Sequence, residues 1–193
     1  MASTFLIAGL GNPGSRYDQT RHNAGFWFLD ALAKREGLTF RNEAKFHGLY
    51  CKAAIQGTQQ LLIMPSTFMN RSGQSVGALA KFFKIPPSQI IAVHDELDLP
   101  PGTMKFKTGG GHGGHNGLRD IHAHLGSADY HRLRLGIGHP GNAKAVADYV
   151  LKAPSIEDRT LIDGAIDEAL RALPLILDAD FARATNQING YKP

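Results

Sequence analysis

Apolar residues along the chain follow two patterns, short continuous runs and longer stretches with helical spacing. Short runs typical of buried strands cover Phe5–Leu10 and Ile90–Asp95. An alternating run over Phe46–Ile55 and a second run over Gln60–Met64, joined by a turn at Gly57-Thr58, predict two neighbouring strands. These four segments predict the centre of a β-sheet.

Helical spacing separates these runs. It predicts helices from Ala24, with Asn23 as the cap, to Gly37, and from Ser72 to Phe83. In the second half, strands are expected at Met104–Lys107 and Arg132–Gly138. Helices are expected at Leu118–Leu125, Ala143–Leu151 and Ile156–Leu173, the last capped by Ser155 with Asp158.

The order of these elements predicts the fold class. Strands that alternate with helices favour an α/β fold, and the short connections between the middle strands require a mixed sheet. We therefore expect a twisted mixed β-sheet flanked by α-helices. The chain has 193 residues and shows no linker or internal repeat, so residues 1–193 are expected to form a single domain.

Composition bears on the partner and on the cellular compartment of the protein. A net charge of +4 permits an anionic partner such as nucleic acid, although a mildly basic protein without such a partner has the same charge. The single cysteine, Cys51, lies in a predicted strand, which favours a buried structural thiol in a reducing compartment. With no signal-peptide pattern and no apolar run near the ~18 residues that span a bilayer, we expect a cytoplasmic protein without membrane contact.

Gly9-Leu10-Gly11-Asn12-Pro13-Gly14 follows a predicted strand and matches the dinucleotide-binding pattern. That motif requires a helix that begins at once and directs its N-terminus at the pyrophosphate. Here Ser15–Gln19 has no apolar helical spacing, and Asp30 falls inside a helix rather than at the end of a second strand. The match therefore does not indicate a dinucleotide site.

Polar residues recur where predicted strands end. Asn12 follows the first strand, Asn70 follows the strand ending at Met64, Asp95 ends the next one, and His22 precedes the first helix. Such positions meet at the carboxyl edge of an α/β sheet. A histidine beside an aspartate is a general base, and asparagines can stabilise an oxyanion. Each of these residues can also serve a cap or turn, and spacing alone leaves both interpretations open.

Several segments together resemble the bacterial-type peptidyl-tRNA hydrolase family. They occur in family order from residue 5 to about residue 150, while the C-terminal third carries little motif. The segments are Gly9–Gly14 with Tyr17, Thr20–Gly25, Pro65–Asn70 with Ser72-Gly73, His94–Asp98, Gly109–Gly117 and Arg132–Gly138.

The resemblance implies hydrolysis of the ester between a peptide and the 3′ end of tRNA. It implies that His22 activates water, that Asp95 orients His22, and that Asn12 and Asn70 position the substrate, Asn70 also supporting the oxyanion. Cleft-lining and substrate-contacting positions correspond to Tyr17, Met69, His115 and Asn116. It further implies a monomer without metal or organic cofactor, whose partner is peptidyl-tRNA, bound at the acceptor stem and 3′ CCA end.

Basic residues alternate along two predicted strands. Lys105 and Lys107 share one face of their strand, as do Arg132 and Arg134. The resemblance implies that Lys107 and Arg134 clamp the 5′ phosphate of tRNA, with Lys105 nearby, and lysine and arginine suit a phosphate. An exposed, solvated strand face is the alternative.

Two rival functions stay open from the residues alone. A metal-dependent hydrolase would use His94, Asp95, His112 and His115, and a chelator would abolish its activity. An RNA-binding module without catalysis would retain its function after replacement of His22. A serine hydrolase is disfavoured because the sequence has no G-x-S-x-G motif. The loop Gly109–Gly117 also lacks the Lys-Ser/Thr ending of a P-loop, which favours a mobile wall over a phosphate cradle.

Overall fold

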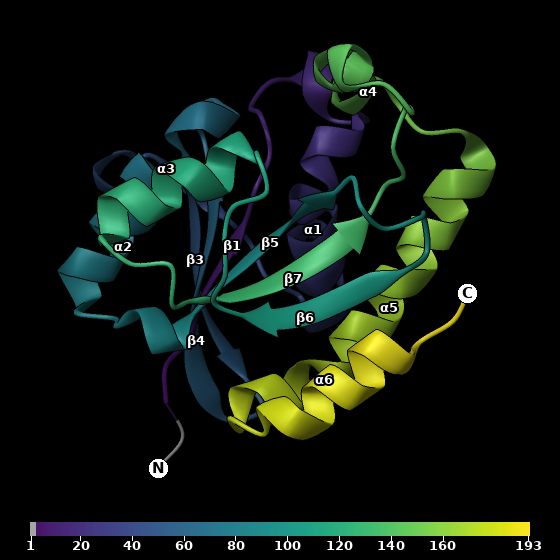
Figure 1. Cartoon of the computed structure of the whole chain (residues 1–193). Helices are drawn as coiled ribbons and strands as arrows, with labels where there is room; N and C mark the ends of the chain where they lie inside the picture. The colour runs from purple at the N-terminus through teal and green to yellow at the C-terminus, as the bar shows by residue number, and fades with distance from the viewer. Residues whose placement is uncertain (1–2) are drawn as a thin grey trace.

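One mixed sheet of seven strands forms the centre of the computed structural model, which describes residues 3–193 (Figure 1). The order across the sheet is β2-β3-β4-β1-β5-β7-β6. The strands are β1 (Leu6–Gly9), β2 (Arg41–Glu43), β3 (Gly48–Ile55), β4 (Thr58–Pro65), β5 (Ile90–Glu96), β6 (Met104–Thr108) and β7 (His131–Gly136).

The middle of the sheet is parallel and its two margins are antiparallel. β1 pairs in parallel with β4 and β5, and β5 pairs in parallel with β7. β3 runs antiparallel to β2 and β4, and β6 runs antiparallel to β7. The carboxyl ends of β1, β4, β5 and β7 therefore share one edge, where ligands of α/β folds gather.

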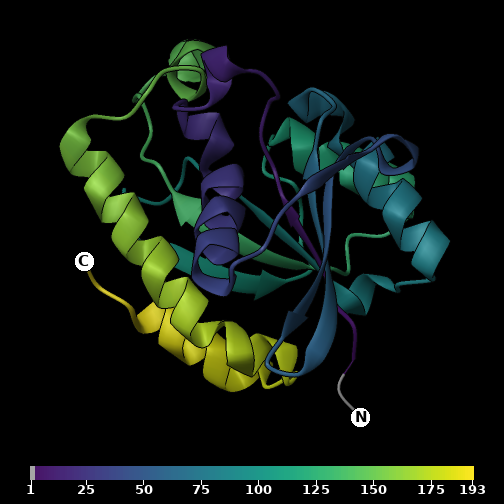
Figure 2. The ribbon, with the colours of Figure 1, turned by 180° about the vertical axis from the view of Figure 1, so that it is seen from behind.

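Helices cover both faces of the sheet. α1, α5 and α6 lie against one face, and α2 and α3 lie against the other, as Figures 1 and 2 show. Their bounds are α1 (Ala24–Glu36), α2 (Ser72–Phe83), α3 (Asn116–Leu125), α4 (Val146–Val150), α5 (Ile156–Leu177) and α6 (Phe181–Gly190). This architecture confirms the predicted α/β class with a mixed sheet.

Alternation along the strands divides the core between these two layers. Ile7 and Val93 pack into the cluster beneath α1 and α5, whereas Leu6, Ala8 and Ala92 pack into the cluster beneath α2 and α3. Cys51 is buried within β3, as expected for a structural thiol. Over residues 3–193, the structure has no helix with both the length and the apolar character needed to cross a membrane.

Several predicted boundaries were wrong. β2 was missed because Arg41–Glu43 is polar and at least partly exposed at the sheet margin, so it lacks an apolar pattern. The strand expected from Phe46 begins at Gly48, after a 3-10 helix over Ala44–Phe46. α5 continues past the expected end at Leu173 and contains Pro174. Its predicted cap is confirmed, since the Ser155 hydroxyl accepts a hydrogen bond from the amide of Asp158.

Close packing of α1 on the sheet determines where the turn before α1 lies. A Cβ atom on Gly25 would come within 2.3 Å of the Val93 carbonyl oxygen and 2.4 Å of the Leu10 amide nitrogen. Only glycine allows this approach between α1 and the ends of β1 and β5. The 3-10 helix Arg21–Asn23, directly before α1, is thereby held beside the carboxyl end of β5.

Candidate active site

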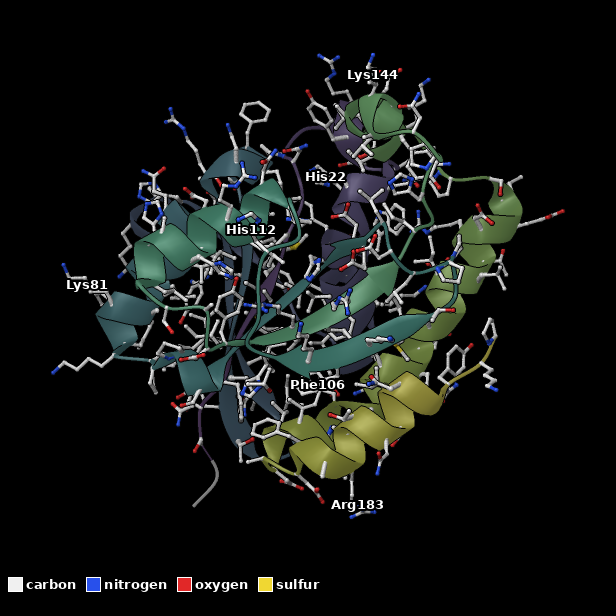
Figure 3. All side chains as sticks on the ribbon, in the orientation of Figure 1. His22, Lys81, Phe106, His112, Lys144 and Arg183 are labelled. Carbon is white, nitrogen blue, oxygen red and sulfur yellow. The ribbon has the colours of Figure 1, made fainter. Side chains whose placement is uncertain are left out.

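His22 and Asp95 meet at the carboxyl edge of the sheet. His22 Nδ1 lies 2.9 Å from Asp95 Oδ2, although the residues are 73 positions apart. Figure 3 shows His22 above the end of β5, on the turn that leads into α1. Asp95 is 3% exposed. Because a carboxylate accepts, Nδ1 of His22 carries the hydrogen and its Nε2 keeps a free lone pair.

A second imidazole, that of His115, hydrogen-bonds the other oxygen of this carboxylate. His115 Nε2 donates to Asp95 Oδ1 at 2.9 Å. His115 Nδ1 accepts from the amides of Gly117 and Leu118, and so it caps α3. These bonds fix the tautomer of His115, because one nitrogen must donate and the other must accept. Both oxygens of Asp95 are therefore satisfied by imidazole N–H groups.

Burial and charge act against each other in this cluster. Burial opposes protonation of His22, but the charge and hydrogen bond of Asp95 outweigh it, so the pKa of His22 is raised above its ordinary value. Burial likewise opposes ionisation of Asp95, and His22 and His115 reverse that effect, which holds the pKa of Asp95 far below its usual range. Asp95 is thus a permanent carboxylate beside a histidine of raised basicity.

A buried pair of asparagines extends the site. Asn23 Oδ1 accepts from the amide of Asn12 at 2.8 Å, and Asn23 Nδ2 donates to the carbonyl of Asn12 at 3.0 Å. Asn23 occupies the predicted N-cap position of α1, but its side chain makes no cap hydrogen bond and holds the backbone of Asn12 instead. Asn12 Oδ1 accepts from the amide of Met69 at 2.7 Å. This bond fixes the amide of Asn12 and leaves its Nδ2 as an available donor.

The turn that carries His22 is anchored by α4. Arg21 donates from its guanidinium to the carbonyl of Tyr149 at 2.9 Å and stacks over the Tyr149 ring. The Arg21 amide donates to the carbonyl of Lys152. The hydroxyl of Tyr149 donates to the carbonyl of Ile137, just beyond β7. These contacts connect the position of His22 to the end of the sheet.

The remaining predicted site residues lie around this cluster with different degrees of constraint. Met69 is buried, and a Cβ atom on Gly117 would meet its Sδ at 2.7 Å, so the start of α3 packs against Met69. Tyr17 is half-buried and packs edge-on against the exposed ring of Phe68. Asn70 is exposed, and within residues 3–193 its side chain makes no hydrogen bond. The structure places Asn70 beside Met69 without fixing its amide.

Asn116 begins α3 and is exposed, with its Oδ1 3.4 Å from a guanidinium nitrogen of Arg119. The glycine-rich loop was expected to extend to Gly117, but α3 starts at Asn116 because His115 caps it. Because His115 caps α3, Asn116 lies in the first turn of a helix and not in the loop.

The four predicted basic residues lie on one face of the sheet, but they differ in burial and in bonding partners. Register pairs Lys105 with Arg134 and Lys107 with Arg132 across β6 and β7. Lys105 and Lys107 are exposed, and Arg134 Nε donates to Glu96 Oε1 at 2.8 Å. Arg132 is 1% exposed and donates to the carbonyls of Gly109 and Ala128. The face is therefore not simply a solvated strand surface, because Arg132 lies beneath the glycine-rich loop.

Sequence reasoning missed three residues that support the site. Asn23 was interpreted only as a helix cap, Arg21 was not singled out, and Arg132 was treated only as part of a basic face. The sequence signal for a buried guanidinium at Arg132 was its place between aromatic Tyr130 and apolar Leu133. The sequence around Asn23 does not distinguish a side chain that caps α1 from one that hydrogen-bonds the backbone of Asn12.

The side chains that lie close enough to share a metal ion differ from those that the alternative of a metal-dependent hydrolase requires. One ligand atom from each of His22, Asp95 and His115 lies within 4.8 Å of the others. The rival's His94 and His112 are not in this group. Asp95 and His115 already have hydrogen-bond partners, because each carboxylate oxygen accepts from an imidazole N–H and His115 Nδ1 accepts from two amides. A cation would have to displace both donors on Asp95.

The fold and this site define an α/β enzyme with a histidine–carboxylate pair at the carboxyl edge of its sheet. Residues 6–193 match the family model of peptidyl-tRNA hydrolase. The chain is 55% identical to "Peptidyl-tRNA hydrolase" of Acinetobacter baumannii (strain AYE), covering 100% of each chain. The chain belongs to the peptidyl-tRNA hydrolase family, and it is an enzyme that hydrolyses peptidyl-tRNA.

Solved structures agree with this assignment. The crystal structure of peptidyl-tRNA hydrolase from Acinetobacter baumannii matches with a TM-score of 0.97 and 52% identity, covering 100% of this chain and 98% of that chain. A complex of peptidyl-tRNA hydrolase with N-propanol matches with a TM-score of 0.96 and 52% identity, covering 98% of this chain and 96% of that chain. The resemblance seen in the sequence motifs is thereby confirmed for the family and its fold.

Proposed function

We propose that His22 is the general base of the hydrolysis and that Asp95 orients it. The observation that carries this proposal is the 2.9 Å contact between His22 Nδ1 and Asp95 Oδ2, which leaves Nε2 as a free acceptor beside a permanent carboxylate. Nε2 takes a proton from water, and the hydroxide attacks the carbonyl carbon of the ester. Asp95 stabilises the imidazolium that forms, since it is already ionised and hydrogen-bonded.

The asparagines stabilise the charge that develops on the ester oxygen. Asn12 Nδ2 is the donor with the firmer support, because its amide is fixed by Met69 and its backbone by Asn23. A donor already in place needs no reorganisation during the reaction. Asn70 is the second donor and closes onto the substrate from its exposed position. Collapse of the tetrahedral intermediate then releases the ribose 3′ oxygen, which takes the proton back from His22.

The substrate binds across the edge of the sheet. Tyr17, Met69, His115 and Asn116 line the cleft for the peptide and the 3′ CCA end. Lys107 and Arg134, with Lys105, bind the 5′ phosphate of the acceptor stem through one face of β7 and β6, the two strands beyond β5. The enzyme acts as a cytoplasmic monomer in this proposal, and its chemistry needs no metal or organic cofactor.

The test is release of N-blocked aminoacyl groups from tRNA, with EDTA present throughout. His22→Ala is expected to lower kcat by about 10²- to 10⁴-fold, the usual contribution of a general base, while tRNA binding persists. His124→Ala, which removes an exposed imidazole on α3, is the control and should retain wild-type turnover.

Three results would contradict the proposal. Full activity of His22→Ala would remove His22 as the base. Loss of wild-type activity in EDTA, restored by added metal, would favour the metal-dependent rival. Loss of tRNA binding in His22→Ala would assign His22 to binding rather than turnover.

A further inference from the structure

A cavity lies on the opposite face of β5 from the pair of His22 and Asp95. It has a volume of about 250 Å³. Its charged lining consists of three cations, Lys107, Arg132 and Arg134, and two carboxylates, Glu96 and Asp98. Figure 3 labels His112, which belongs to the loop that borders this cavity. Side chains alternate along β5, so Asp95 serves the catalytic cluster while His94, also in the lining, serves this cavity.

His94 is a polar side chain without a use in the proposed chemistry. It is 1% exposed, and its Nδ1 lies 2.8 Å from the carbonyl oxygen of Asp95. A carbonyl only accepts, so Nδ1 carries the hydrogen and Nε2 presents a bare lone pair. Within residues 3–193, Nε2 is buried and has no hydrogen-bond partner. A buried acceptor without a donor is costly, which indicates a group that a ligand satisfies.

The surroundings keep this imidazole neutral. Burial and the neighbouring ring of His115, whose centroid lies 4.9 Å away, lower the pKa of His94 to about 3, and Arg134 acts in the same direction. Lys107 and Arg132, on β6 and β7, add positive charge around the cavity, while Glu96 pairs with Arg134. His94 Nε2 therefore stays an acceptor at the pH values at which the enzyme would work.

These groups together specify the chemistry of an occupant. The cations attract an anionic oxygen, whereas the bare lone pair of His94 repels one and requires a hydrogen. We propose that His94 is a specificity residue of this cavity, which accepts one hydroxyl hydrogen of the 5′-terminal nucleotide of tRNA at Nε2 while Lys107 and Arg134 hold the phosphate of that nucleotide. The hydroxyl belongs either to the phosphate as its monoanion or to the ribose of the same nucleotide. The proposal rests on the phosphate clamp of Lys107 and Arg134 proposed above.

The two sources of the hydrogen differ in their pH dependence. A terminal phosphate has a second pKa of about 6, so binding as the monoanion above that pH requires uptake of one proton. Its affinity then falls by about tenfold per pH unit. A ribose hydroxyl stays protonated, so its contribution is independent of pH and disappears in a 2′-deoxynucleotide.

The experiment measures binding of four acceptor-stem RNA hairpins to the whole enzyme by fluorescence anisotropy, at pH 6 and pH 8. The hairpins carry a 5′-phosphate, a 5′-methylphosphate, a 5′-hydroxyl, or a 5′-phosphate on a 2′-deoxy first nucleotide. The methylphosphate is a monoanion without a hydrogen to donate. It also reports any effect of pH on the enzyme that does not depend on the donated hydrogen, because such an effect changes the binding of all four hairpins.

The expected result is loss of affinity by about 3- to 10-fold when the donating hydroxyl is absent, the usual effect of one hydrogen bond. If the phosphate donates, the methylphosphate hairpin binds more weakly than the phosphate hairpin at pH 6, and that advantage disappears at pH 8. If the ribose donates, the 2′-deoxy hairpin is weaker at both pH values.

The variant His94→Phe keeps a ring against His115 but removes the acceptor, and it should abolish the discrimination. If this variant does not fold, the four hairpins measured on the wild-type enzyme still test whether a hydroxyl hydrogen is accepted. Equal binding of the phosphate, methylphosphate and 2′-deoxy hairpins at both pH values would overturn the role of His94. Equal binding of the phosphate and hydroxyl hairpins would instead overturn the clamp itself, so the two failures are distinguishable.

Discussion

At the scale of the residue, burial acts in opposite directions on His22 and Asp95, and their contact overrides it in both. Each group favours the charged form of the other, so His22, the proposed base, has a raised affinity for protons. That property suits a base that must take a proton from water. It also predicts how the reaction responds to pH.

Replacement of Asp95 by asparagine should move the pH dependence of the reaction. The raised pKa of His22 places the rising limb of kcat/KM above pH ~6.5 in the wild type, because only neutral His22 accepts a proton. In Asp95→Asn the charge is lost while burial remains, so the limb shifts to lower pH. The plateau should also fall by on the order of 10²-fold. Asp163→Asn on α5 is the control, and an unchanged limb in Asp95→Asn would contradict the pairing.

The amide of Asn12 allows a nearly isosteric test of oxyanion support. Asn12→Asp keeps an oxygen for the Met69 amide but replaces the Nδ2 donor with a second oxygen. We expect kcat to fall by about 10²- to 10³-fold, with a smaller change in KM, because the loss affects the transition state more than the bound substrate. Thermal unfolding of the variant verifies that it is folded. A kcat within a few fold of wild type would leave Asn70 as the only candidate donor.

At the scale of the element, α3 is connected to the carboxylate of Asp95 through its own cap, His115. His115 accepts from the first amides of α3 with Nδ1 and donates to Asp95 with Nε2. The end of the glycine-rich loop is therefore held by the same residue that satisfies Asp95. A change in the loop that moves His115 would alter both the helix and the base.

The two contacts of His115 can be separated by substitution. His115→Asn keeps a good helix cap but cannot reach Asp95 in the same way, whereas His115→Ala loses both contacts. We expect His115→Ala to be less stable than His115→Asn by about 1 kcal/mol in urea unfolding. Both variants should lose kcat/KM to a similar extent, since both leave one oxygen of Asp95 without its donor. Equal stability of the two variants would show that the cap contributes nothing.

The elements also show what the sequence could and could not predict. α2 begins and ends as predicted, because its buried face runs from Ser72 to Ala80 and partly buried Phe83 packs on the same cluster. β2 has no such face, and its pairing with β3 is a property of the tertiary structure. α5 continues through Pro174 with packing on the core that local propensity does not include.

Some features of the candidate site could likewise be predicted from the sequence, and others could not. The family resemblance named His22 and Asp95, and the structure places them in contact. The bonds between Asn23 and Asn12, and between His115 and Asp95, join segments that approach only in the folded chain. Side-chain orientation in such contacts depends on register and close packing, for example at Gly25, and a linear pattern carries no information on either.

At the scale of the whole molecule, charge is distributed so that one face can hold a polyanion while the reaction occurs at its margin. β5 separates the two proposed sites, with Asp95 beside His22 on one face and Arg134 beside His94 in the cavity on the other. Both sites border His115, which packs against His94 and bonds Asp95. Binding of the tRNA body and positioning of its 3′ end can therefore occur together on one rigid sheet.

Salt dependence tests this distribution of charge. Lys107→Ala combined with Arg134→Ala should raise KM for peptidyl-tRNA more than for a short substrate without a 5′ phosphate. Because each phosphate-contacting cation releases counterions, the slope of log(1/KM) against log salt should become shallower by roughly one to two. Arg171→Ala combined with Arg183→Ala removes the same charge from exposed positions on α5 and α6, the helices on the other face of the sheet (Figure 1). If that control changes the slope equally, binding depends on net charge rather than on the basic face, and the clamp has no specific role.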